Sequence, residues 1–472
     1  MTDQGSQLLD ALAAVDADGL RPSDYGADLF AAQRTQPAPA VDFDLMLSRA
    51  AIRLITHLHY GRVDPHAAGF ELPEPRSDLD VPGAVIALAS APRVSDALAA
   101  VEPHFYHYRL LKQALARYRV LAKDPALTQL PALGRRTVHA GEGYAGAPAL
   151  RRLLTARGDL PPTQNATAQD ATLDGALVQA LQRFQAAHGL APDGSLGADT
   201  YAALTTALTQ RVRQIELTLE RWRWLPPFEQ PPIIVNIPQF MLFAFETTED
   251  RGAAVQGMSV IVGKAYPRTR TPIFVGKMTR VIFRPFWDIP RDIMLREMLP
   301  AIRADGGYLE HNHLELVDGA TDTSPVVSPS PDALAALGAG RLRLRQKPGD
   351  DNSLGLIKFI FPNTYDVYLH ATPVHRLFLQ PKRAFSHGCI RVSDPVALAR
   401  YVLRHEPGVW DEEHIIAAMH GADSSRVELH SPIPVMVLYA TALATEAGPV
   451  QFFADLYGHD ARLQALLDRQ PR

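Results

Sequence analysis

Cys389 is the residue of this sequence with the clearest potential for covalent chemistry. It is the single cysteine among 472 residues, which excludes an internal disulfide and a cysteine-based zinc cluster. Polar and small residues surround it in the segment Phe385–Val392, where a buried structural thiol would have apolar neighbours on both sides. A cysteine attacks as its thiolate, and a pKa of about 8.5 leaves only a small fraction ionised at neutral pH. The thiol therefore needs a nearby base.

His370 is the best candidate for that base. It ends the strand-like run Tyr365–His370, and the segment between it and Cys389 is long enough for a loop that brings one strand end beside another. His387 and His375 are the competing bases.

Gly388 stands directly before the cysteine. A residue without a Cβ permits unusual φ values and leaves room for substrate to approach the peptide unit that it shares with Cys389. Backbone N–H groups can then point at one place, and each preorganised donor to an oxyanion typically lowers a barrier by about 2.7–4 kcal/mol. The arrangement is suited to acyl transfer.

His370 followed by Ser386-His387-Gly388-Cys389 resembles the signature of the L,D-transpeptidases, enzymes that remodel bacterial peptidoglycan. Further similarity lies in Leu58–Pro65, Val235–Phe240, Phe283–Ile293 and Arg341–Pro373. These segments indicate the long subgroup that carries a scaffold domain, and the resemblance extends over most of the chain.

The resemblance implies a role for each matching residue. Cys389 is the nucleophile, and His370 is the base that activates it and then protonates the leaving amine. Ala371 has no hydroxyl, so only its carbonyl could orient the imidazole. The other implied residues are Ser386, His387 and Gly388 in the nucleophile turn, and Tyr368 and Arg391 in substrate binding.

The substrate implied by the resemblance is a tetrapeptide stem of peptidoglycan. Cys389 attacks the L,D-linked carbonyl of the diamino-acid residue, releases the terminal D-alanine and becomes a thioester. An amine from a neighbouring stem resolves the thioester into a 3→3 cross-link, whereas water would make the protein a carboxypeptidase. No metal or organic cofactor is needed, because the thioester conserves the energy of the broken bond. Carbapenems are the implied covalent inhibitors, and a substrate outside the cytoplasmic membrane implies a periplasmic or wall-facing location.

Two alternatives stay open. Related thiol enzymes cleave existing cross-links or release wall-attached lipoprotein, and the motif does not separate making from breaking. The other alternative is a non-catalytic scaffold in which Asp174–Leu208 binds the cell wall and the thiol is inactive.

The hydrophobic periodicity predicts a multidomain α+β protein. Residues 1–150 are Ala- and Leu-rich with helical spacing, and Pro161-Pro162 with the polar residues after it form a break. Residues 151–210 include a small helical hairpin that resembles the peptidoglycan-binding repeat of cell-wall enzymes. We expect a linker helix over 211–231, a mostly β catalytic domain over 232–472, and a polar, lid-like insertion at about 300–345.

Composition narrows the class of protein. The length predicts two or three domains, and the formal net charge of -4 argues against nucleic acid as a partner. The first twenty residues show neither a signal peptide nor a membrane anchor, although a leader removed before this point would escape notice. Protein partners cannot be predicted from these features.

Two further groups of residues have alternative interpretations. His311 and His313 alternate between Glu310 and Glu315 without a convincing third ligand, so we expect a solvated loop and no metal site. Trp222 and Trp224 could stack on sugar rings, but a position beside a domain junction favours packing.

Overall fold

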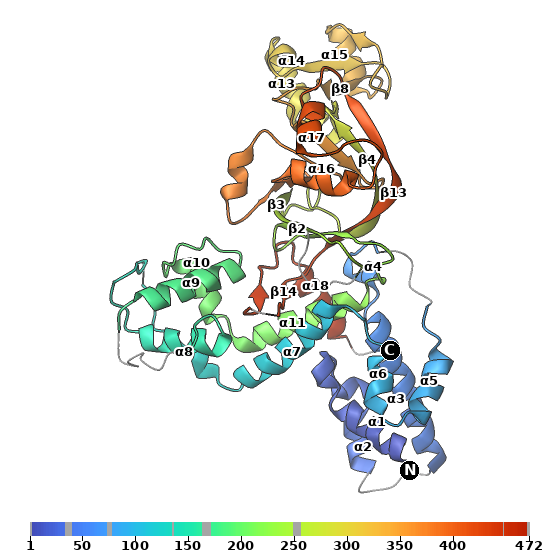
Figure 1. Ribbon diagram of the computed structural model, residues 1–472, viewed down its shortest axis with the longest axis vertical. Coiled ribbons are helices and arrows are strands. Elements are labelled where there is room, and N and C mark those ends of the chain that lie inside the picture. Colours follow the sequence, from blue (N-terminus) through green and yellow to red (C-terminus); the bar gives the residue numbers. More distant parts are fainter. Residues whose placement is uncertain are drawn as a thin grey trace.

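The computed structural model describes residues 2–33, 40–72, 78–134, 136–162, 171–248, 256–446 and 448–469. Figure 1 shows a helical region around the N-terminus, a second helical unit beside it, and a β-rich region at the opposite end. This arrangement confirms the predicted α+β multidomain architecture. Of the predicted polar break, Pro161 and Pro162 are described, whereas residues 163–170 lie outside the described part of the chain.

The N-terminal helices pack around a core of their own. Buried residues of this core run from Leu8 to Val101 and include Leu12, Leu54 and Leu58. The helices of this core are α1 (Asp3–Ala13), α2 (Ala27–Gln33), α3 (Ala40–Tyr60), α5 (Val81–Ser90) and α6 (Val94–Ala99). Ala68 of α4 (Pro65–Ala68) lies instead in the core of the β-rich region. The next helix, α7 (Tyr106–Leu121), belongs to a different core, so the region predicted as one helical domain to residue 150 contains two packing units.

The second unit contains the predicted helical hairpin. Its helices are α8 (Ala147–Arg157), α9 (Gly175–Ala187) and α10 (Ala198–Thr205). Asp174 caps α9 by accepting from the N–H of Leu177, and Gly189 leaves the helix with a φ of 65°, as a glycine after a helix end does. Phe184 is fully buried. We call this unit the module.

The helix predicted as a linker is a central packing element. It runs as α11 (Leu208–Arg223) and ends before Pro226-Pro227, not at residue 231, because proline cannot continue a helix. Its Ile215 and Leu219 lie in the core of the module, whereas its Leu217 lies in the core of the β-rich region. The two bodies are therefore joined by shared buried surface, not by a free linker.

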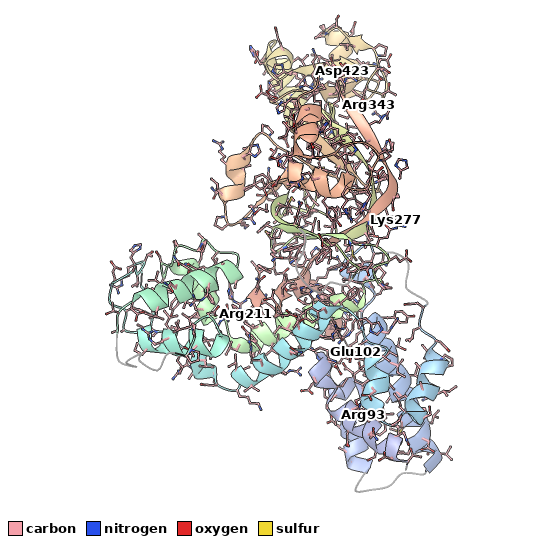
Figure 2. The ribbon with its side chains drawn as sticks, in the orientation of Figure 1. Arg93, Glu102, Arg211, Lys277, Arg343 and Asp423 are labelled. Carbon is pink, nitrogen blue, oxygen red and sulfur yellow. The ribbon has the colours of Figure 1, made fainter. Side chains whose placement is uncertain are left out.

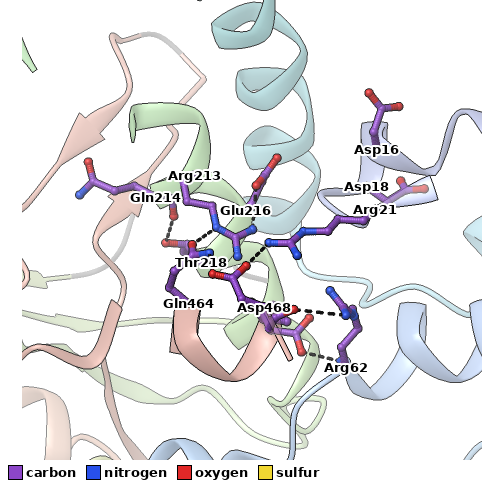
Figure 3. Close-up of polar contacts among 12 residues, drawn as sticks. Asp16, Asp18, Arg21, Arg62, Arg213, Gln214, Glu216, Thr218, Gln464 and Asp468 are labelled. Atoms are coloured by element: carbon purple, nitrogen blue, oxygen red, sulfur yellow. Dashed lines mark hydrogen bonds and ion pairs between the residues drawn. The ribbon is translucent and has the colours of Figure 1, made fainter. Parts of the chain in front are cut away.

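Polar contacts tie the N-terminal region and the C-terminus to this helix (Figure 3). Arg21 pairs with Asp468, directly after α18 (His459–Leu467). On α11, Arg213 pairs with Glu216 at 2.9 Å and also hydrogen-bonds Gln464 of α18. Solvent-exposed ion pairs each contribute little to stability, so these contacts set the orientation of elements that apolar burial already holds together.

Buried arginines reinforce the joint between the module and the C-terminal hairpin of β14 (Ala442–Leu443) and β15 (Gln451–Phe452). Arg157 pairs with Asp159 at 3.1 Å and lies over the ring of Phe184 at 4.8 Å. Arg211, labelled on α11 in Figure 2, lies over the ring of Phe452 at 4.9 Å. Arg211 is buried, and this burial lowers its pKa to about 9.

The β-rich region is a nine-stranded sheet within the described residues. The order is β11-β3-β12-β10-β9-β4-β13-β1-β2, and β2 also pairs with β3, so the sheet closes on itself. The strands are β1 (Ile233–Asn236), β2 (Met241–Ala244), β3 (Gln256–Gly263), β4 (Phe274–Phe283), β9 (Ile357–Ile360), β10 (Leu369–His370), β11 (Ala384–Ser386), β12 (Ile390–Val392) and β13 (Ser425–Leu438). Helices α16 (Pro395–Leu403) and α17 (Glu412–Met419) pack on it through Leu398 and Ile415. Asp394 caps α16 by accepting from the N–H of Ala397.

The insertion is a folded subdomain and not a polar loop. A four-stranded sheet has the order β5-β8-β6-β7, with strands β5 (Trp287–Asp288), β6 (Leu314–Val317), β7 (Val326–Val327) and β8 (Arg343–Gln346). Its helices are α12 (Arg291–Ile293), η4 (Met294–Met298), α13 (Leu299–Ala304), α14 (Tyr308–His311) and α15 (Pro331–Gly338). Scattered apolar residues such as Leu316, Leu337 and Leu344 form its separate core.

Two of the predicted loop histidines lie in this subdomain. The solvated loop predicted between Glu310 and Glu315 is wrong, because His311 ends α14 and Glu315 lies in β6, where its carboxylate pairs with Arg345 at 2.6 Å. Strand pairing across the small sheet brings these two residues together. That pairing is a long-range feature, which the alternation of residue types alone does not reveal.

Buried histidines should make the fold sensitive to acid. Burial lowers the pKa of His57 to about 3 and of His459 to about 4, and lowers that of His188 well below its usual range. Below about pH 6.5 these imidazoles bind protons in the unfolded chain but stay neutral in the folded protein. The free energy of unfolding therefore decreases as the pH falls. Burial raises the carboxyl pKa of Glu102 and Asp159, which offsets part of this loss.

We therefore expect the melting temperature to fall by several degrees between pH 7 and pH 5, in circular-dichroism melts at constant ionic strength. A melting temperature that stays constant or rises over this range would show that the histidines are not buried in neutral form.

Candidate active site

Strand register brings the predicted base and nucleophile together. β10 and β12 are parallel neighbours, with Leu369 opposite Ile390 and His370 opposite Arg391. The N–H of Ile390 donates to the carbonyl of Tyr368 at 3.0 Å, so Cys389 lies beside Tyr368 at the entry to β12. Since side chains alternate along a strand, Cys389 and His370 share one face of the sheet as diagonal neighbours.

His370 is a buried and neutral imidazole. Only 3% of it is exposed, and its Nδ1 donates to the carbonyl of Ala371 at 2.6 Å, the contact expected from the sequence. A proton held on Nδ1 leaves Nε2 as the basic nitrogen. Burial, with a further contribution from the Arg391 charge, lowers the pKa of His370 to about 3. The ring is therefore available as a base at neutral pH.

The thiol of Cys389 is half-buried and is held among polar groups. Its Sγ contacts the carbonyl of Asp366 at 3.6 Å, and Asp366 has a positive φ of 54°. Burial raises the pKa of the thiol, while hydrogen bonds from the backbone and hydroxyl of Tyr368 oppose that rise. Tyr368, predicted to bind substrate, thus lies against the sulfur.

Two cations flank the reacting pair. Lys358 of β9 stands opposite His370 across the sheet, and its Nζ lies 3.9 Å from the centre of the Tyr368 ring. Arg391 flanks His370 on the other side, and both positive charges lower the pKa of Cys389. Lys358 was not among the site residues predicted from the sequence. Its single charge inside the apolar run Leu356–Phe361 could have indicated a functional role.

The nucleophile turn is locked by its own hydrogen bonds. Ser386 Oγ accepts from the N–H of Gly388 at 3.1 Å and donates to the carbonyl of Cys389 at 2.6 Å. Thr271 Oγ1 donates to the carbonyl of Gly388 at 2.8 Å. Gly388 has a φ of 126°, a conformation that favours glycine. Because the N–H of Gly388 is engaged within the turn, this turn offers fewer donors to an oxyanion than the sequence suggested.

Three family models match parts of the chain. A family model described as "L,D-transpeptidase catalytic domain" matches residues 231–421. Residues 231–421 therefore resemble an L,D-transpeptidase catalytic domain. Models described as "Scaffold domain" and "Putative peptidoglycan binding domain" match residues 1–115 and 146–204 of the same chain.

Two individual proteins were also found to be similar to this chain. A Haemophilus influenzae protein named "Putative L,D-transpeptidase" is 31% identical over 252 residues, which are 53% of this chain and 49% of that protein. The chain thus spans about half the length of this relative. A crystal structure of an L,D-transpeptidase from Xylanimonas cellulosilytica is 15% identical, with 66% of this chain and all of that chain covered and a TM-score of 0.20.

The two alternative bases, His387 and His375, are both exposed. His387 is exposed, and its Nε2 lies 2.9 Å from Oε1 of Glu297 in η4 of the insertion. His375 is exposed at the start of η5 (His375–Leu379). Of the three candidate histidines, His370 is the one buried on the same sheet face as Cys389.

The described residues contain no group of three or more His, Cys, Asp or Glu side chains arranged to hold a metal ion. None of the helices described is long and apolar enough to cross a membrane.

Replacing Lys358 by methionine should raise the pKa of Cys389. The change keeps the length and apolar stem of the side chain and removes the charge that favours the thiolate. We expect alkylation of the thiol by iodoacetamide at pH 8 to slow by about threefold to tenfold, since one pKa unit is a tenfold change in ionisation.

The matched control for this variant is Lys277→Met. Lys277 is exposed on β4 and is labelled in Figure 2. Its replacement should leave the alkylation rate unchanged. Equal rates in the wild type and in Lys358→Met would show that the ammonium does not act on the sulfur.

Proposed function

We propose that the protein is a peptidoglycan L,D-transpeptidase that forms 3→3 cross-links through a thioester on Cys389. The observation that carries the proposal is the placement of Cys389 and His370 on one face of neighbouring strands, with Nδ1 of His370 fixed by the carbonyl of Ala371. This orientation supports a base at Nε2 and a nucleophile at Sγ, as acyl transfer requires.

The proposed reaction starts from a neutral pair. Because the pKa of His370 lies at about 3 and burial raises that of Cys389, the thiol keeps its proton until substrate arrives. Sγ then attacks the L,D-linked carbonyl of the stem while Nε2 of His370 accepts the thiol proton. The same proton passes to the amine of the departing D-alanine, and Sγ retains the acyl group as a thioester.

The second half of the reaction transfers the acyl group to an acceptor. An amine from a neighbouring stem attacks the thioester, His370 removes its extra proton, and this proton returns to the sulfur as the thioester opens. Lys358 and Arg391 favour the negative charge that develops on the sulfur when the thiol gives up its proton and again when the thioester opens. Among the described residues, Nε of Arg391 is buried without a hydrogen-bond partner, which supports contact with a substrate carboxylate.

Intact-protein mass spectrometry with purified disaccharide-tetrapeptide tests the proposal. We expect an adduct equal to the substrate minus D-alanine on the only cysteine. Analysis of the released products then separates a cross-linked dimer from a tripeptide made by hydrolysis or from cleavage of existing cross-links. Absence of any adduct would contradict the proposed thioester.

Carbapenem labelling distinguishes the enzyme from a non-catalytic wall-binding scaffold. A reactive Cys389 should become acylated by a carbapenem, whereas an inert thiol should not. The proposed substrate also implies that the protein works in the periplasm or on the wall side of the inner membrane, which fractionation of cells producing it would check.

A further inference from the structure

Lys358 is a cation beside the reacting pair whose charge is only partly compensated. It is half-buried on β9, and its Nζ lies over the ring of Tyr368. In the described part of the chain, no hydrogen bond or ion pair joins Nζ to another residue. An aromatic ring replaces only part of the hydration that a buried ammonium loses. The charge of Lys358 is therefore available to an anionic ligand.

The carboxylates around Lys358 act on it without pairing with it. Asp288, Asp322 and Asp366 favour its charged form electrostatically, but none of the three forms an ion pair with Nζ. Burial is the larger influence and lowers the pKa of Lys358. A carboxylate within hydrogen-bonding distance stabilises a buried ammonium more strongly than distant charges do. A ligand with a carboxylate at this point would supply that contact.

Three neighbouring strands place the nucleophile, the base and this cation in one order. Cys389 lies at the entry to β12, His370 lies on β10, and Lys358 stands directly opposite His370 on β9. Directly opposite residues share a face of the sheet, and neighbouring strands are about 4.8 Å apart. Lys358 therefore lies on the far side of His370 from Cys389.

The donor stem of the proposed reaction has its reacting groups in the same order. Sγ of Cys389 attacks the carbonyl carbon, and Nε2 of His370 protonates the amine that departs. In a terminal D-alanine the carboxylate is bonded to the same carbon atom as this amine, so its oxygens lie roughly 3 Å from the amine nitrogen. A stem that runs from Cys389 past His370 thus brings this carboxylate to the side where Lys358 stands.

Arg391 is the alternative partner for the carboxylate, but its position fits a different part of the stem. It flanks His370 on the opposite side from Lys358 and follows Cys389 by two residues in the chain. A carboxylate bound there would belong to the acyl part of the stem, which stays on the sulfur. The two cations are therefore suited to carboxylates on opposite sides of the scissile bond.

We propose that Lys358 binds the carboxylate of the departing D-alanine and thereby selects donor stems whose terminal carboxyl group is free. The inference rests on the proposed function, because it assigns a specificity-determining residue to that reaction. A stem whose terminal carboxyl is an amide would cover the ammonium with an uncharged group and give it no counter-charge. Such a stem should be a poor acyl donor.

Two substrates that differ only in this charge test the proposal. One is disaccharide-tetrapeptide, and the other is the same compound with its terminal carboxyl converted to a primary amide. The measurement is kcat/KM for thioester formation, followed by mass spectrometry. Wild type should favour the acid by about tenfold or more, the usual effect of a hydrogen bond between charged groups. Lys358→Met should favour the acid by less than about threefold, and Lys358→Arg, which keeps the charge, should retain most of the preference.

The ratio of the two rates separates this role from the effect of Lys358 on the thiol. A change in the pKa of Cys389 slows both substrates by the same factor, whereas loss of the carboxylate contact slows only the acid. An unchanged ratio in Lys358→Met would overturn the proposal. So would a ratio that collapses in Arg391→Gln and persists in Lys358→Met, because the carboxylate would then lie on the other side of His370.

Arg280→Gln is the matched control. Arg280 lies on β4, which neighbours β9, and on the same face as Lys358. Its guanidinium already lies 3.6 Å from the carboxylate of Glu428, so its replacement should leave the ratio unchanged. A wild type that reacts with the amide as fast as with the acid would contradict the proposal whether or not the variants fold.

Binding to the Cys389→Ala protein keeps this outcome separate from that of the thioester. In that background, calorimetry should show that the acid binds more tightly than the amide by about tenfold or more, and adding Lys358→Met should abolish the difference. If this result holds and wild type forms no thioester, the transpeptidase proposal fails and the carboxylate site stands. If the thioester forms equally fast from acid and amide, only the proposed role of Lys358 fails.

Discussion

Cys389→Ala is expected to lower acyl transfer by at least about 10⁴-fold, because loss of the nucleophile from a covalent mechanism removes nearly all chemical catalysis. The measurement is the rate of D-alanine release from disaccharide-tetrapeptide by wild type and variant. Since Cys389 lies at the entry to β12 and is not part of a core cluster, the variant should keep the wild-type melting temperature within a few degrees.

Cys389→Ser sharpens the interpretation of that result. The hydroxyl occupies the place of the thiol but ionises far less readily, so the serine variant should be almost as inactive as the alanine variant. Release of D-alanine by either variant at more than a hundredth of the wild-type rate would assign the reaction to another residue.

His370→Gln is expected to slow thioester formation by about 10²–10⁴-fold, the usual contribution of a positioned general base. Glutamine can still donate toward the carbonyl of Ala371, so the local fold should survive, but its amide cannot accept the thiol proton. The readout is the rate at which the adduct accumulates in single-turnover mass spectrometry.

The rival bases provide the controls for this prediction. His387→Gln and His375→Gln, both at exposed positions, should retain rates within severalfold of wild type. A rate for His370→Gln equal to wild type, with a large loss in either control, would transfer the role of base to that control residue.

The pH profile of the wild type supplies an independent check. With the pKa of His370 lowered to about 3, the imidazole stays neutral through pH 5, so protonation of the base should cause no loss of activity near pH 6.5. The rate of thioester formation should instead rise toward alkaline pH as the thiol ionises, since burial raises the pKa of Cys389. An acid limb centred near pH 6.5 would contradict a buried neutral imidazole.

Local signals in the sequence predicted much of the fold. The helical hairpin of the module and the mostly β character of the C-terminal region were both predicted, because helix periodicity and strand propensity depend on near neighbours. The motif around Cys389 also predicted His370 as the base and the carbonyl of Ala371 as the group that orients it. These features need only short stretches of chain.

Features that depend on long-range pairing were not predictable. Lys358 reaches the thiol only because β9 and β12 both flank β10, and Glu297 meets His387 only because the insertion folds over the nucleophile turn. The insertion itself has few and widely spaced apolar residues, which hides its core from periodicity. The joint role of α11 in two cores also requires knowledge of what packs against each of its faces.

The position of β13 has a practical consequence for dissecting the protein. Residues 231–421 match the catalytic family model, yet β13, which pairs with both β1 and β4, begins at Ser425. A fragment that ends at the limits of that match would lack β13, an interior strand of the closed sheet. The edges of β1 and β4 would then be unpaired, and unpaired strand edges favour aggregation. Its C-terminal hairpin, needed to seat the module, would be lost as well. Soluble production of the catalytic part should therefore require the chain through α18.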